Sequence, residues 1–124
     1  MLFRSWLENC IWHAPEVINS KTYDTRSDVY AYGIILWELA ARTNPFAEIL
    51  WMTQIEDSVK SGIRPTLDLD WPKPYIDLMT ECWAQDPRLR PSFKGILIRI
   101  RNFVDRQLNE RQQSHSCSGI HQPS

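Results

Sequence analysis

The residues best suited to chemistry in this 124-residue chain are a few histidines and cysteines. Cys10 and His13 are three residues apart, a spacing that could supply two ligands to a zinc ion. Structural zinc sites use four ligands, and no second pair lies near these two in the sequence. A looser group, in a polar stretch near the C-terminus, consists of His115, Cys117 and His121. We interpret both groups as chance spacings and expect no metal site.

Charge and composition argue against nucleic acids and membranes as partners. Lys and Arg number 14 and Asp and Glu number 15, so the net charge of −1 offers no general attraction for phosphates or anionic lipids. The longest apolar run, residues 29–36, is far shorter than the roughly 20 residues that span a bilayer. Three widely separated cysteines favour reduced thiols and a cytoplasmic location.

Helical periodicity dominates the elements that must position any site, and no segment alternates as a strand would. One amphipathic helix should begin at Pro91, a second should end before Asp86 and Pro87, and a third should end at Gly62. Their apolar faces are, in that order, Phe93, Ile96, Leu97, Ile100, Phe103, Val104 and Leu108; Tyr75, Leu78, Met79, Cys82 and Trp83; Leu50, Trp51, Ile55 and Val59. A short helix is expected after Pro15.

The segment 27–41 differs from these helices because its apolar residues surround the helix axis. They are Val29, Tyr30, Tyr32, Ile34, Ile35, Leu36, Trp37 and Leu39. Such a helix needs cover on all sides. Thr25 or Ser27 should cap its first turn, where Asp28 favours the positive end of the helix dipole. The predicted fold class is therefore all-α, with about five helices, and the polar residues 112–124 should form a disordered tail.

Five short sequence blocks occur in a fixed order from about residue 11 to residue 104. They are Ala14-Pro15-Glu16; Ser27-Asp28-Val29-Tyr30-Ala31-Tyr32-Gly33-Ile34 with Leu36-Trp37-Glu38-Leu39; Asn44-Pro45-Phe46; Cys82-Trp83-Ala84-Gln85-Asp86-Pro87; and Arg90-Pro91-Ser92-Phe93. Together they resemble the C-terminal part of a eukaryotic protein kinase domain. The Cys82-Trp83 and Trp37-Glu38 pairs resemble tyrosine kinases and the tyrosine-kinase-like serine/threonine kinases more than other branches.

The resemblance implies an ion pair between Glu16 and Arg90, which would tie the end of the activation segment to the loop before the last helix. Spacing alone would not predict that two charges 74 residues apart meet. The resemblance also implies that Asp28 and Trp37 anchor the central helix. Asp28 would fix the catalytic loop in the family; in this sequence we favour its role at the helix N-terminus.

Two segments are candidates for protein contacts. By resemblance, Asn9, Cys10, Ile11 and Trp12 form the loop that positions the substrate. Asn9 stands where serine/threonine kinases usually have Thr and tyrosine kinases often have Pro. Trp51 would lie on a docking surface for substrates or regulators; alternatively, it is a core residue beside Leu50 and Ile55.

The residues that would transfer phosphate are absent from this sequence. Its four glycines form no Gly-rich phosphate loop, and no Val-Ala-Ile-Lys, His-Arg-Asp or Asp-Phe-Gly motif occurs. We therefore expect these 124 residues alone to be inactive and to bind no cofactor, whereas the full-length family would use ATP and Mg²⁺. The expected function is that of a protein kinase fragment for serine or threonine, with tyrosine less favoured; the alternative is a kinase-derived module that binds proteins without catalysis.

The resemblance divides the chain into three parts. Residues 1–13 would end the activation segment, residues 14–108 would be a partial kinase domain, and residues 109–124 would hold the end of the last helix and the tail. The expected partners are the missing N-lobe and catalytic-loop segment, and protein substrates or regulators. Without those segments, part of the central helix should stay exposed.

Overall fold

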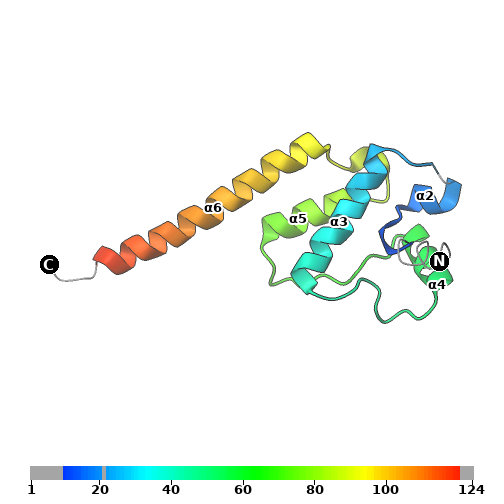
Figure 1. Ribbon diagram of the computed structural model, residues 1–124, viewed down its shortest axis with the longest axis horizontal. Helices are drawn as coiled ribbons and strands as arrows, with labels where there is room; N and C mark the ends of the chain where they lie inside the picture. Colours follow the sequence, from blue (N-terminus) through cyan, green and yellow to red (C-terminus); the bar gives the residue numbers. More distant parts are fainter. Residues whose placement is uncertain (1–9, 21, 121–124) are drawn as a thin grey trace, which may run out of the picture. The chain divides into compact units, whose positions relative to one another are not determined.

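The computed structural model describes residues 10–20 and 22–120, with side chains for residues 11–20 and 22–113. All regular secondary structure in this part of the chain is helical, which confirms the predicted fold class (Figure 1). The chain divides into two compact units, one up to Ser92 and the other from Phe93 onward. The elements of the first unit are η1 (Cys10–Trp12), α2 (Pro15–Ser20), α3 (Thr25–Ala41), α4 (Met52–Lys60), α5 (Lys73–Cys82) and η2 (Pro87–Leu89); the second unit consists of α6 (Phe93–Ile120).

The central helix α3 begins with a capping box. Asp24 has an extended backbone, and its carboxylate accepts hydrogen bonds from the backbone N–H groups of Arg26 and Ser27 at 2.8 and 3.4 Å. The Ser27 hydroxyl in turn accepts from the Asp24 N–H. The expectation that Thr25 or Ser27 would be the cap was therefore wrong, because a carboxylate one residue before the helix reaches both free N–H groups.

One side of α3 forms the core of the first unit. The residues of α3 with less than a tenth of their surface exposed are Ser27, Val29, Tyr30, Gly33, Ile34, Leu36 and Trp37. Ile35 and Leu39, by contrast, are 43% and 66% exposed. These two residues are four positions apart and so lie on one face of the helix. The structure confirms the expected patch of exposed apolar surface on α3.

Helix α5 packs along α3, and Gly33 sets how closely the two helices approach (Figure 1). A Cβ atom placed on Gly33 would lie 2.9 Å from the Cβ of Cys82 and 3.1 Å from the carbonyl oxygen of Met79. Both are tighter than ordinary van der Waals contacts. The absence of a side chain at Gly33 therefore allows the backbones of α3 and α5 to meet.

We expect Gly33→Ala to lower the free energy of unfolding by about 1–2 kcal/mol. Overpacking costs about 1–3 kcal/mol, and the better helix propensity of Ala offsets at most about 1 kcal/mol of it. Urea unfolding of the two proteins measures the difference. A variant that is more stable than the parent, as at an open helix position, would contradict the close contact.

The ends of α4 and α5 differ from the expected ones. Helix α4 begins at Met52, so Leu50 and Trp51 precede it, while Ile55 and Val59 are buried as predicted. Gly62 follows its C-terminus at φ 99°, a left-handed conformation that favours glycine. Helix α5 stops at Cys82, before the expected Asp86-Pro87 boundary, and Asp86 instead caps the short helix η2.

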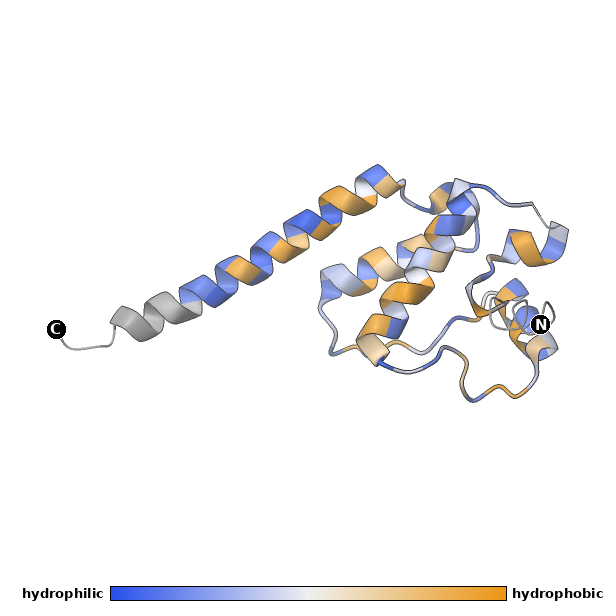
Figure 2. Ribbon diagram, viewed as in Figure 1, coloured by the Kyte–Doolittle hydropathy of each residue, from blue (hydrophilic) through white to orange (hydrophobic). Residues whose placement is uncertain are grey.

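Helix α6 runs from Phe93 to Ile120 and carries the recurring apolar residues predicted for it, as Figure 2 shows along its first turns. It starts at Phe93, two residues after the predicted start at Pro91. The prediction of a disordered tail was wrong for residues 112–120, which are helical. Once a helix has formed, each added residue contributes a hydrogen bond, and the Gln and Arg residues at 111–113 are good helix formers. Residues 121–124 lie outside the described residues.

No helix within the described residues has the length and apolar character required to cross a bilayer.

Candidate functional site

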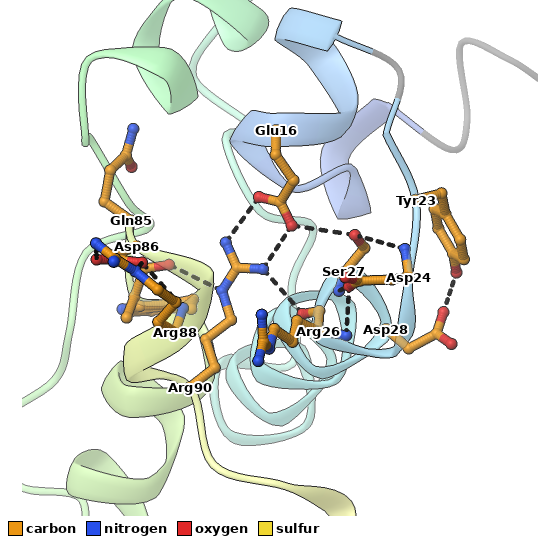
Figure 3. A network of polar contacts seen from close by, with 12 residues as sticks. Glu16, Tyr23, Asp24, Arg26, Ser27, Asp28, Gln85, Asp86, Arg88 and Arg90 are labelled. Carbon is orange, nitrogen blue, oxygen red and sulfur yellow. Dashed lines mark hydrogen bonds and ion pairs between the residues drawn. The ribbon is translucent and has the colours of Figure 1, made fainter.

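The most elaborate polar cluster is centred on an ion pair between Glu16 and Arg90. The guanidinium of Arg90 donates two hydrogen bonds to the two carboxylate oxygens of Glu16, at 2.7 and 2.9 Å (Figure 3). The Arg90 side chain has no exposed surface, and that of Glu16 is 20% exposed. The structure thus joins two residues 74 positions apart, as the family resemblance predicted.

Arg90 is held on its other edges by main-chain carbonyls. Its Nε–H donates to the carbonyl of Ala84 at 2.9 Å, and Nη1 also donates to the carbonyl of Arg26 at 2.8 Å. The second carboxylate oxygen of Glu16 accepts a further hydrogen bond from the Ser27 hydroxyl at 3.0 Å. This one arginine therefore links α2, the first turn of α3 and the loop after α5.

Opposing effects act on the protonation of Glu16. Burial raises the pKa of its carboxyl group, but hydrogen bonds from Arg90 and Ser27, together with the positive charge of Arg90, outweigh burial. The pKa of Glu16 consequently lies below its ordinary value of 4.5. The carboxylate is charged at neutral pH, as the ion pair requires.

The predicted anchors of α3 have different environments. Asp28 is exposed and accepts a hydrogen bond from the hydroxyl of Tyr23, which agrees with a role at the helix N-terminus (Figure 3). Trp37 is only 7% exposed, and its indole N–H donates to the carbonyl of Thr66 at 2.7 Å. Its ring also meets that of Trp71 edge-on, with centroids 6.5 Å apart. Trp37 therefore fixes the otherwise irregular segment 66–71 to the central helix.

The predicted substrate-positioning loop is described only in part. Asn9 lies outside the described residues, as does the side chain of Cys10, whereas Cys10–Trp12 form η1. Ile11 and Trp12 are half-buried, and the indole N–H of Trp12 donates to the carboxylate of Glu38 at 2.5 Å. The end of this loop is thereby tied to α3.

A cavity of about 240 Å³ lies between this loop and the start of α3. Its lining residues are Trp12, His13, Ala14, Tyr23, Ser27 and Ala31. Burial lowers the pKa of His13, against a smaller opposing effect of Glu56. His13 is therefore neutral at physiological pH, since its ordinary value of 6.5 is already below 7.

The described residues do not fit the nucleotide and metal used by intact kinases. Gly33 is packed against α5 and Gly62 ends a helix, so neither lies in a loop that could surround phosphate groups. Among the described side chains, no three His, Cys, Asp or Glu residues are grouped to hold a metal ion. The side chains of Cys10, His115, Cys117 and His121 are outside this set.

Trp51 lies on the surface. It precedes α4 in an extended conformation and is 66% exposed, and its neighbour Leu50 is 87% exposed. The interpretation of Trp51 as a core residue was wrong. The Ile55 N–H does donate to the Trp51 carbonyl at 3.2 Å, but the extended backbone of Trp51 keeps it from being part of the helical face that includes Ile55. Helix α4 itself packs against η1 and α2 through its other residues.

Sequence reasoning missed the part played by Arg64. Its guanidinium donates to the carbonyls of Trp83 and Val59 at 3.0 and 3.1 Å, and to the side-chain oxygen of Gln85 at 2.5 Å. Gln85 donates in turn to the carbonyl of Lys60. The sequence feature that could have indicated this role is the position of Arg64 just beyond a helix C-terminus, where Arg commonly binds the last carbonyls.

Comparison with known proteins relates most of the chain to one family. The family model described as "Protein tyrosine and serine/threonine kinase" matches residues 6–100. The chain is 37% identical over 107 residues, 85% of its length, to a probable serine/threonine-protein kinase, roco8, of Dictyostelium discoideum. It is 45% identical over 87 residues, 69% of its length, to mitogen-activated protein kinase kinase kinase 7 of Bos taurus. The chain spans 6% and 15% of the lengths of these two relatives.

Proposed function

The chain belongs to the protein tyrosine and serine/threonine kinase family, and from this premise we propose that it is the helical C-terminal part of a kinase domain whose intact form phosphorylates proteins on serine or threonine. The observation that carries the proposal is the bidentate Glu16–Arg90 pair, in which the Arg90 side chain is fully buried. It joins two of the five family-like sequence blocks. Similarity to roco8 and to mitogen-activated protein kinase kinase kinase 7 favours the tyrosine-kinase-like branch.

The chemistry of the intact protein would depend on residues that this chain does not contain. Transfer of the γ-phosphate needs Mg²⁺ ligands, a lysine for the phosphates and an aspartate beside the acceptor hydroxyl. The described residues provide none of these groups, so ATP and Mg²⁺ belong to the full-length protein. The present chain would contribute the base on which the catalytic loop rests and the loop beside the substrate, including Ile11 and Trp12.

The missing catalytic-loop segment and N-lobe are the partners that we propose for the uncovered side of the first unit. Ile35 and Leu39 expose apolar surface on α3, and Tyr23 is 62% exposed at the edge of the cavity. Covering an apolar side chain of this size stabilises by about 1.5–3 kcal/mol when burial is complete.

We further propose a cytoplasmic location, for which the expected reduced thiols are the argument.

A second candidate function is a binding module without catalysis. The exposed Leu50 and Trp51 favour it, because large apolar side chains that are adjacent and uncovered are typical of contact surfaces for proteins. The partner would be a protein substrate or regulator that covers the Trp51 indole.

One experiment distinguishes the two functions. The chain is lengthened by the residues that its upstream reading frame encodes and is incubated with labelled ATP, Mg²⁺ and a mixed-sequence Ser/Thr peptide library. We expect that frame to contain His-Arg-Asp and then Asp-Phe-Gly before Ala14, and labelled phosphoserine or phosphothreonine to appear. The control carries Asn for Asp in the His-Arg-Asp motif and should be inactive.

A closed upstream frame, or no phosphate transfer by the lengthened chain, would overturn the proposed kinase function. The binding module would then be supported if a captured protein is released by Trp51→Ala but not by Leu69→Ala, a change at another exposed apolar residue (83% exposed, against 66% for Trp51).

A further inference from the structure

Tyr30 is the largest of the fully buried side chains, and two cations contact its ring. The guanidinium carbon of Arg64 lies 5.0 Å from the ring centroid, and that of Arg90 lies 5.2 Å from it. Both distances are within the roughly 6 Å range of cation–π attraction, which is strongest where water is excluded. The ring of Tyr30 thus contacts two arginines that come from different loops.

The two arginines also bind neighbouring peptide groups. The Nε–H of Arg64 donates to the carbonyl of Trp83, and the Nε–H of Arg90 donates to the next carbonyl, that of Ala84. These carbonyls directly follow the C-terminus of α5. The positions of the two guanidiniums are therefore set together, by the ring of Tyr30 and by consecutive acceptors on one segment.

The hydroxyl of Tyr30 contributes no hydrogen bond within the described part of the chain, although it is buried. An unpaired buried hydroxyl is a cost to the folded state, so the hydroxyl does not explain a tyrosine at this position. The contacts of Arg64 and Arg90 with Tyr30 are made to its aromatic ring.

We propose that Tyr30 is a positioning residue whose ring couples Arg64 to the Glu16–Arg90 ion pair. The route runs from the loop after α4, through Arg64, the ring and Arg90, to Glu16 on α2. Among the described residues Arg64 and Glu16 share no hydrogen bond. The ring of Tyr30 and Arg90 lie between them, beside the adjacent carbonyls of Trp83 and Ala84. The opposite charges of Arg64 and Glu16 also interact directly. A change in the loop that carries Arg64 then alters the strength of the Glu16–Arg90 pair.

The test is a double-mutant cycle between Arg64→Lys and Glu16→Gln, measured by urea unfolding of the whole chain. Lysine keeps the charge at residue 64 but lacks the planar fork that binds several carbonyls, so a direct charge effect of residue 64 on Glu16 is unchanged. Each single variant should raise the unfolding equilibrium constant by some factor. We expect the factor for the double variant to be at least threefold smaller than the product of the two single-variant factors. Uncoupled sites multiply to within about twofold.

The same cycle is repeated in two backgrounds that both remove the hydroxyl. Tyr30→Phe keeps the ring and should keep the coupling. Tyr30→Leu should remove the coupling, so that the double-variant factor comes within twofold of the product of the two single-variant factors. Tyr75→Phe is the control, since the Tyr75 hydroxyl donates to the carbonyl of Leu36 and its loss should lower stability without changing the coupling. A multiplicative cycle in the parent, coupling that persists with Leu, or coupling lost with Phe would each overturn the proposal.

A second measurement needs no background that could fail to fold. The ¹⁵N–¹H signal of the Arg90 Nε–H is followed in the parent and in Tyr30→Phe, where the nearby ring shifts it. Arg64→Lys should move this signal in both proteins, while Arg88→Lys, at an 80% exposed arginine on η2, should leave it in place. An Arg90 signal that does not respond to Arg64→Lys would overturn the coupling.

Discussion

Arg90→Met should lower the free energy of unfolding by about 3 kcal/mol at pH 7, and up to about 5 kcal/mol if Glu16 stays buried in the variant. Removing one partner of a buried ion pair leaves the other charge without compensation. We expect the lower value because the Glu16 side chain is one-fifth exposed and water screens it in part. The hydrogen bonds of Arg90 to the carbonyls of Ala84 and Arg26 are lost as well.

The effect of pH separates the charge from the packing of Arg90. In the parent, the lowered pKa of Glu16 stabilises the fold fully above its ordinary value of 4.5, and this stabilisation is lost as pH falls through the lower folded value. In Arg90→Met the remaining effects are burial, which raises the pKa of Glu16, and the hydrogen bonds from the Glu16 backbone and from Ser27, which lower it. Protonation then relieves a carboxylate that has lost its partner charge. The difference in stability between the two proteins should therefore shrink as pH falls below 4.5.

Chemical unfolding at several pH values measures both the loss of stability in Arg90→Met and its dependence on pH. A stabilising osmolyte is added if the variant unfolds in buffer. Arg88→Met is the matched control, because Arg88 is 80% exposed and pairs only locally with Asp86. It should change stability by no more than about 0.5 kcal/mol. An Arg90→Met loss that does not vary with pH would mean that packing, rather than the ion pair, is what Arg90 supplies.

Trp37→Ala is the second change expected to have a large effect, a loss of about 3–5 kcal/mol. The variant removes a large buried ring, its edge-on contact with Trp71 and the hydrogen bond to the carbonyl of Thr66. Trp37→Phe should recover most of the packing but leave that carbonyl without the indole donor, at a cost of about 1 kcal/mol.

Trp51→Ala is the matched control for Trp37→Ala, because it removes the same side chain from a position that is 66% exposed. We expect a change within about 0.5 kcal/mol. Thermal unfolding followed by near-ultraviolet circular dichroism compares the three variants. Equal losses for Trp37→Ala and Trp51→Ala would show that Trp51 is covered in solution and would argue against the exposed surface at Leu50 and Trp51.

The sequence predicted the helices because their signal is local. Ile55 and Val59 in α4, and Leu78, Met79 and Cys82 in α5, have the spacing of one helical face and are buried as expected. Helix ends were predicted less well, since they depend on single hydrogen bonds. The Asp24 cap, for example, depends on the extended backbone of one residue just before the helix.

The candidate site could not be derived from spacing. Glu16 and Arg90 are 74 residues apart, and only the family resemblance brought them together; the structure adds the shared ring of Tyr30, for which the sequence gives no sign. Arg64 was also missed, because most of its acceptors are main-chain carbonyl groups, which every residue type has. Trp51 was misread because periodicity does not show where a helix begins.

The separation of Glu16 from Arg90 has a consequence for the order of events during synthesis. At about 5–20 residues per second, roughly 4–15 s pass between addition of the glutamate and addition of the arginine that pairs with it. A six-residue helix such as α2 is too short to persist by itself in water. The nascent chain therefore cannot form the Glu16–Arg90 pair until translation has passed η2, and before that point α2 has only contacts such as its packing against α4 to hold it.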